Sequence, residues 1–95
     1  PKKLSLLSVE GENLQLTSLK RAEDHPDRWV CRIYNPTWKP VTGSLRCWKP
    51  LVGAWLVNLN EEHPEPLSLE GDHTVNLKIP AKKIVTVMLG WREEG

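Results

Sequence analysis

Apolar and polar residues alternate along most of this chain, and turns that contain proline or glycine interrupt the alternation at short intervals. Between Thr74 and Ile79, for example, Val75 and Leu77 alternate with polar residues. A period of two places the apolar side chains on one face of a β-strand. No stretch shows the apolar spacing of a convincing helix. The pattern therefore predicts a chain built from strands.

The alternating stretches define the expected strands. Their ranges are 4–9, 14–19, 29–34, 41–48, 54–59, 74–79 and 84–89. Turn residues separate them, and the 8 prolines and 6 glycines at these spacings would break helices. The last range is nearly all apolar, which indicates a strand buried on both faces. These features predict an all-β fold, an immunoglobulin-like antiparallel β-sandwich of about seven to eight strands.

Length, charge and cysteine content limit the function classes. With 95 residues, the chain is expected to form a single domain over residues 1–95. The 13 basic and 12 acidic residues leave a net charge of +1, which argues against a nucleic-acid or anionic-membrane partner. No apolar run approaches the roughly 20 residues of a spanning helix, and no signal-peptide pattern is visible. Because 2 cysteines exclude a disulfide scaffold, nothing indicates secretion and a cytoplasmic location is expected.

The two cysteines fall on the apolar faces of consecutive predicted strands. If residues 34–41 form the connection of a hairpin centred near Lys39, Cys31 lies opposite Cys47. Directly opposed residues of an antiparallel pair have Cβ atoms about 4.5–5.5 Å apart, somewhat beyond the disulfide range. Two buried thiols are therefore the expected state, with a bridge as the alternative.

Residues that could bind a metal or catalyse hydrolysis do not fall into known patterns. The candidate metal ligands, none of which are spaced as in structural zinc sites, are His25, His63, His73, Cys31 and Cys47. There is no Gly-x-Ser-x-Gly nucleophile motif. Glu61 and Glu62 would point to opposite faces of a strand, and the acids within 23–27 are typical of a turn. The sequence thus predicts neither catalytic residues nor a metal site in this segment.

The aromatic residues are mostly tryptophan, with 5 Trp, 1 Tyr and no Phe. Trp29 and Trp55 occupy alternating positions that suit a core. Trp38, Trp48 and Trp91 fall in turn, outward or terminal positions. Exposed aromatic side chains indicate either a ligand platform or a face packed on another domain. Composition favours the packed face, and the sugar-stacking candidates in the other case are Trp38 and Trp48.

Three segments carry four motifs in a familiar order. They read LTSLKRAEDHPDRWVCRIYNPT, LVNLNEEHPEPL and LKIPAKKIVTVML. The chain resembles, over about residues 4–89, the C-terminal β-sandwich of the glycoside hydrolase family 38 α-mannosidases, especially the bacterial, mannosylglycerate hydrolase-like members. The matching residues are Ser18, Lys20, Glu23, Asp24, Arg32, Tyr34, Asn35, Pro36, Thr37, Leu59, Glu61, Glu62, Pro66, Leu67, Pro80, Ile84 and Thr86. At Ala81-Lys82-Lys83 the chain departs from the family, which usually has an aromatic and an acidic residue after the proline.

The resemblance implies the C-terminal fragment of a larger multidomain enzyme. Members of the family cleave α-mannosides with retention, and they hold a divalent metal, normally zinc, and a nucleophilic Asp in an N-terminal domain. No cofactor and no catalytic residue are therefore expected in this segment. The implied partners are the remaining domains of the same polypeptide, and the carbohydrate substrate is bound by the parent enzyme.

The expected role of the segment is to pack on the catalytic part of the enzyme and stabilise it. The interface candidates, drawn from the Asn-Pro turn and from a paired-acid strand end, are Tyr34, Asn35, Pro36, Thr37, Glu61 and Glu62. For these residues, a turn that serves only its own structure is the alternative. Two rival functions stand beside this one: a carbohydrate-binding module that uses Trp38 or Trp48, and a catalytic fragment.

Overall fold

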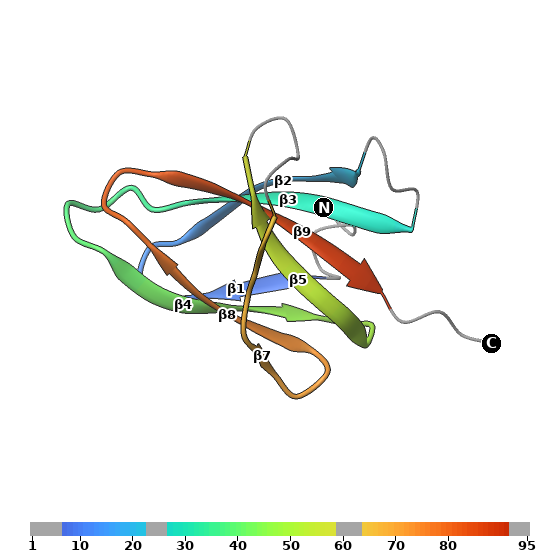
Figure 1. The fold of residues 1–95 in the computed structure, drawn as a ribbon. Helices are drawn as coiled ribbons and strands as arrows, with labels where there is room; N and C mark the ends of the chain where they lie inside the picture. The colour runs from blue at the N-terminus through green and yellow to red at the C-terminus, as the bar shows by residue number, and fades with distance from the viewer. Residues whose placement is uncertain (1–6, 23–26, 59–63, 92–95) are drawn as a thin grey trace.

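The computed structural model describes residues 7–22, 27–58 and 64–91. Within these ranges all regular elements are β-strands, and they form two sheets packed face to face (Figure 1). One sheet has the order β1 (Leu7–Glu10), β4 (Val41–Cys47), β8 (Thr74–Ile79), β7 (Leu69–Glu70). The other has the order β2 (Gln15–Arg21), β3 (Arg28–Tyr34), β9 (Ile84–Trp91), β5 (Leu51–Val57), β6 (Glu65–Pro66). Every neighbouring pair is antiparallel, which confirms the predicted all-β sandwich.

The main hydrophobic core fills the space between the two sheets. Leu45 of β4 is fully buried and lies between Val9 of β1 and Val75 of β8. On the facing sheet, Ile33 of β3 and Val87 of β9 are also fully buried. Each strand turns alternate residues inward, so the period of two in the sequence becomes one continuous apolar layer.

β9 is the middle strand of the five-stranded sheet, between β3 and β5. Its inward residues meet the other sheet, whereas Met88 packs on the outer face with Val30, Val57 and the partly buried Trp55. As a result, the strand is buried on both faces from Thr86 onward. This confirms the prediction for the second part of the range 84–89, whereas Ile84 at its start is 56% exposed and Val85 is partly buried.

The predicted strand limits agree closely with the observed ones. β8 coincides with the predicted range 74–79, and β4 ends one residue before the end of the range 41–48. β5 starts at Leu51, earlier than the predicted 54, because a bulge between Leu51 and Gly53 lets the chain pair with β9 before the alternation becomes regular. The strands β6 and β7 were not predicted, since two residues are too few to show a period. Residues 4–6 and 59 of the predicted strands lie outside the described ranges.

The predicted hairpin between β3 and β4 is wrong. These strands belong to different sheets, so residues 35–40 cross from one sheet to the other instead of joining neighbours. Cys31 pairs with Leu19 and Val87, and Cys47 pairs with Leu7. Both edges of β3 are already occupied by β2 and β9. The two thiols nevertheless face the same core from opposite sheets, and both are buried and free, as expected.

Both thiols should resist alkylation while the chain is folded. Burial raises the pKa of Cys31 from 9.0 to about 12, with a further contribution from Cys47, and burial alone raises the pKa of Cys47 from 9.0 to about 12. At pH 8 this leaves about a thousandfold less thiolate than in the unfolded chain. We expect iodoacetamide to modify either cysteine only as fast as the protein unfolds, whereas the chain in urea should react at once. Rapid labelling in native buffer would contradict the buried placement.

The same shifts give the stability a pH dependence. The unfolded thiols lose their protons above about pH 9, whereas the folded thiols keep theirs until about pH 12. The contribution of the neutral thiols is therefore complete below pH 9, and it is lost as the pH rises toward 12.

The tryptophans divide differently from the prediction. Trp29 packs against the main core, as expected, but Trp55 lies on the outer face of the five-stranded sheet. There the Arg28 guanidinium stands 4.5 Å from the centroid of the Trp55 ring. Trp91 was expected to be exposed near the chain terminus, but it is only 9% exposed because β9 continues as far as Trp91, which pairs with Leu51.

Candidate functional site

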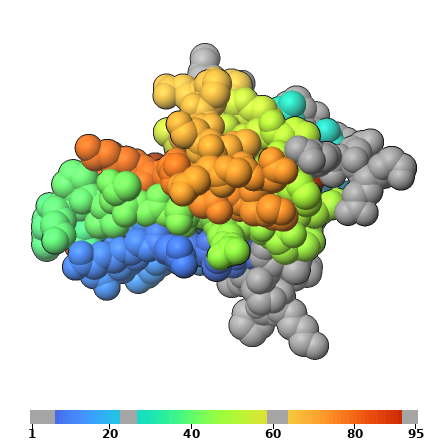
Figure 2. Space-filling view, turned by 90° about the horizontal axis from the view of Figure 1, so that it is seen from below, coloured from blue at the N-terminus to red at the C-terminus, as the bar shows by residue number. Residues whose placement is uncertain are grey.

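The connection from β3 to β4 and the turn from β8 to β9 lie together at one end of the sandwich, on the left in Figures 1 and 2. Residues 35–40 and 80–83 are here named the Trp38 tip. Two backbone hydrogen bonds join its halves: Asn35 N–H donates to the Lys83 carbonyl (2.9 Å), and Lys82 N–H donates to the Thr37 carbonyl (3.0 Å). Lys82 has a φ of 56°, in the left-handed region that non-glycine residues seldom adopt. The two segments, far apart in sequence, thus form one unit.

The Asn35 side chain holds this unit together from inside. It is fully buried, and its Nδ2 donates to the carbonyl oxygens of Lys39, Ile79 and Pro80 at 2.9, 3.0 and 3.1 Å. Its Oδ1 accepts hydrogen bonds from the Thr37 backbone N–H (2.9 Å) and the Thr37 hydroxyl (2.7 Å). Asparagine suits this position because its short amide can bond backbone groups of the following residues and thereby form a turn.

Trp38 projects from the tip into solvent. Its side chain is 85% exposed, more than any other large hydrophobic side chain in the described ranges. The Lys82 Nζ lies 4.3 Å from the centroid of the indole ring, which is cation–π geometry. The Lys39 Nζ lies 3.8 Å from Glu12 Oε2, and Lys83 is also exposed. The tip therefore presents an aromatic ring with lysines beside it.

Four of the predicted interface residues belong to this end of the molecule. Tyr34 closes β3 on the outer face of the five-stranded sheet and is half-buried, as are Pro36 and Thr37. Asn35 is buried, and both polar atoms of its side chain bond atoms of its own chain. The other two candidates, Glu61 and Glu62, lie outside the described residues.

Sequence reasoning missed the lysines of the β8–β9 turn. Ile79 pairs with Val41, and this pairing carries the turn to the side of the β3–β4 connection. The available signal was the departure from the family pattern at Lys82 and Lys83. That signal did not place these residues near Trp38, because their neighbourhood depends on the pairing of β4 with β8.

Trp48, the second sugar-stacking candidate, lies at the end of β4 and is 46% exposed. Its ring centroid is 4.8 Å from that of Trp91, and the ring planes are tilted by 54°. The buried Nε1 of Trp91 has no hydrogen-bond partner among the described residues. Nearby, His73 Nδ1 lies 3.0 Å from the Cys47 carbonyl oxygen. One side of the Trp48 ring is thus occupied by another aromatic ring.

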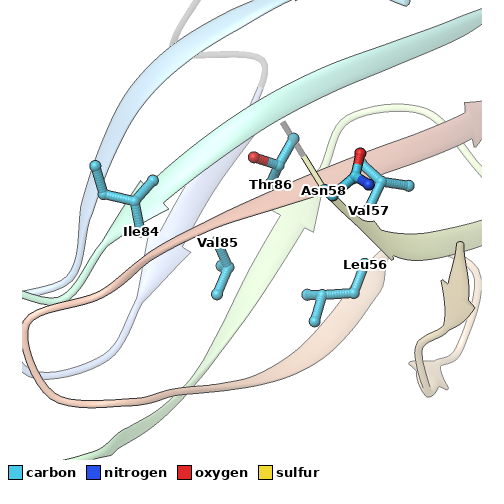
Figure 3. A pocket seen from close by; sticks show the side chains of 6 residues that line it. All are labelled: Leu56, Val57, Asn58, Ile84, Val85 and Thr86. Carbon is cyan, nitrogen blue, oxygen red and sulfur yellow. The ribbon is translucent and has the colours of Figure 1, made fainter. Parts of the chain in front are cut away.

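A hollow of about 310 Å³ lies where β5 ends beside the start of β9 (Figure 3). Ile84 and Thr86 project to one side of β9, and Val85 projects to the other (Figure 3). The hollow is lined by Leu56, Val57, Asn58, Ile84, Val85 and Thr86. None of these side chains titrates, so the lining offers no general acid or base.

The described residues supply no group of three or more His, Cys, Asp or Glu side chains that could hold a metal ion. His25, His63 and the acidic residues 23–24 and 61–62 lie outside these ranges. Across the same ranges, none of the elements is a helix with the length and apolar character to cross a membrane.

The family assignment rests on a match over most of the chain. Residues 13–87 match the family described as the glycosyl hydrolases family 38 C-terminal β-sandwich domain. The chain belongs to this family. It is a C-terminal β-sandwich domain of the family 38 glycosyl hydrolases, and the matched range lies inside the 4–89 of the resemblance seen in the sequence. Comparison with curated proteins and with solved structures gave no match.

Proposed function

We propose that this domain packs on the catalytic part of a retaining family 38 α-mannosidase and stabilises it. The match of residues 13–87 to the C-terminal β-sandwich of the family carries the proposal. The exposure of Trp38 also supports the proposal, because its ring adds nothing to the buried core and exposed apolar surfaces are typical of contacts between domains. The bacterial, mannosylglycerate hydrolase-like enzymes are the proposed subgroup.

The chemistry of the proposed parent enzyme would lie outside this domain. A divalent metal, which we propose to be zinc, does not fit the described residues, because they provide no cluster of ligands for it. The metal, the nucleophilic carboxylate and the carbohydrate substrate would therefore be held by the preceding domains of the same cytoplasmic polypeptide. This domain contributes contacts and no catalytic step.

Deleting this domain from the parent enzyme should lower the unfolding temperature and the yield of soluble hydrolase. Contacts between domains are lost, and the surface that they covered becomes exposed to water. Thermal unfolding and mannosidase activity after heating measure the effect. The purified 95-residue chain should not hydrolyse an aryl α-mannoside. A truncated enzyme as heat-resistant as the full-length one, or hydrolysis by the 95-residue chain, would contradict the proposal.

A carbohydrate-binding module is the second candidate, favoured by the exposure of Trp38 and Trp48. Against it, Thr37 and Asn35 use their polar groups within the tip, so lysines are the polar side chains left beside Trp38. Neutral sugars are usually held by a mixture of donors and acceptors in a concave site. A saturable change of tryptophan fluorescence with millimolar mannoside would favour the binding module over the docking domain.

A further inference from the structure

The Trp38 tip places a large apolar ring where the fold gains nothing from it. At 85% exposure the indole has most of its surface in water, and Lys82 lies beside it in cation–π geometry. Exposed tryptophans are frequently the residues that contribute most to protein–protein binding. The exposure alone does not identify a binding partner. The hydrogen bonds, shape and charge of the tip indicate which kind of partner it fits.

The tip is fixed in shape. The buried Asn35 amide donates to one carbonyl oxygen in each half of the tip, those of Lys39 and Pro80, and to that of Ile79 at the end of β8. The Lys82 N–H joins the two halves again by donating to the Thr37 carbonyl. Presenting an aromatic anchor from a rigid turn lowers the conformational entropy lost on binding.

The shape and charge of the tip select the kind of partner. Trp38 protrudes at the end of the molecule, and small sugars and cofactors usually bind in concave sites instead. A protruding ring fits a pocket on another protein surface. Lys39, Lys82 and Lys83 are all exposed on the tip, and one acidic residue, Glu12, lies within 3.8 Å of Lys39. The matching pocket would therefore carry carboxylates around its rim.

We propose that the Trp38 tip is the docking element of this domain, and that Trp38 enters an apolar, carboxylate-rimmed pocket on the preceding part of the same polypeptide. This inference rests on the proposed function, because it names the surface through which the domain stabilises the enzyme. Lys82 keeps one side of the ring beside a positive charge, and Lys39 and Lys83 add charge on the same tip. The contact is consequently both apolar and sensitive to salt.

Oxidation of Trp38 by hydroxyl radicals, located by mass spectrometry, tests this contact. In the full-length parent enzyme, Trp38 should be oxidised at least about tenfold more slowly than in the 95-residue chain, as expected for a ring buried in an interface. The double variant K82E/K83E should restore fast oxidation in the full-length enzyme. W38A should lower the unfolding temperature of the full-length enzyme and leave that of the 95-residue chain nearly unchanged.

Two matched variants control for effects away from the tip. Val52 is 62% exposed at the start of β5, at the other end of the five-stranded sheet, so V52A removes apolar surface without touching the tip. Arg46 is an exposed cation of β4 that pairs with Ser8 and Thr74, so R46E reverses a charge elsewhere. Both should leave the oxidation rate of Trp38 in the full-length enzyme unchanged.

The outcomes separate the inference from the proposed function. If deletion of the domain destabilises the enzyme but Trp38 is oxidised equally fast in both proteins, the tip is not the docking element, although the domain still docks. If deletion of the domain does not change the stability of the enzyme, both the proposed function and the docking role of the tip are wrong. Protection of Trp38 in the 95-residue chain that grows with its concentration would assign the tip to a second copy. Protection by added mannan would assign it to carbohydrate, and either result overturns the proposal.

Discussion

Replacing Asn35 with alanine should destabilise the domain by about 3 kcal/mol, a large part of the roughly 5–15 kcal/mol typical of a small domain. The buried amide bonds the carbonyl oxygens of Lys39, Ile79 and Pro80, and its Oδ1 accepts from Thr37. Alanine removes all of these hydrogen bonds from a buried site, although the Lys39 carbonyl keeps the Thr37 hydroxyl (2.9 Å) and the Pro80 carbonyl keeps the Lys83 N–H (3.3 Å) as donors. Urea unfolding of the 95-residue chain, followed by circular dichroism, measures the loss.

The substitution N35D separates the donors of Asn35 from its acceptor. The new carboxyl keeps the shape and the acceptor toward Thr37, but when ionised it cannot donate to the three carbonyl oxygens. Burial beside these oxygens raises its pKa above that in the unfolded chain. The variant should therefore be least stable at neutral pH and should approach the wild type as the pH falls and the carboxyl becomes protonated.

For N35A, a loss of stability below about 1 kcal/mol would show that the hydrogen bonds of Asn35 do not hold the tip together.

Alternation in the sequence located the strands but did not identify their neighbours. A period of two is a local property, and it was enough to define β8 and most of β4. Which strands pair depends on edges left free by segments far away in the chain. β3 pairs with β9, whose partner residues lie 50 to 62 positions later in the chain, so the nearby β4 is left to the other sheet. The cysteines kept their predicted inward direction and lost their predicted pairing for this reason.

The candidate site shows the same division between local and distant information. The exposure of Trp38 could be foreseen, because Pro36 and Pro40 on either side of it keep the segment out of a regular strand. The position of Lys82 beside the Trp38 ring could not be foreseen, because this position depends on the pairing of β4 with β8. Trp91 shows the opposite error: its place near the end of the sequence suggested exposure, and strand pairing buried it.

Shortening Leu45 to alanine should cost about 3–4 kcal/mol of stability, within the range measured for leucine in well-packed cores. Leu45 is fully buried in the middle of β4, between Val9 and Val75, and it faces the five-stranded sheet across the core. The strands around it are held by hydrogen bonds on both sides, so they can close the resulting cavity only in part. Guanidinium unfolding, followed both by circular dichroism and by tryptophan fluorescence, measures the effect.

Leu69 is the matched control for this substitution. It lies in β7 at the edge of the four-stranded sheet and is only partly buried, so L69A removes the same atoms where water already replaces part of the packing. We expect a loss of about 1 kcal/mol there, because less apolar surface returns to solvent. Three of the 5 tryptophans, Trp29, Trp55 and Trp91, belong to the five-stranded sheet, whereas Leu45 belongs to the other one. If the two sheets share a single core, L45A must shift the fluorescence and circular dichroism transitions together. A shift of only one of them would mean that the sheets unfold separately, which the continuous core between Leu45 and Ile33 contradicts.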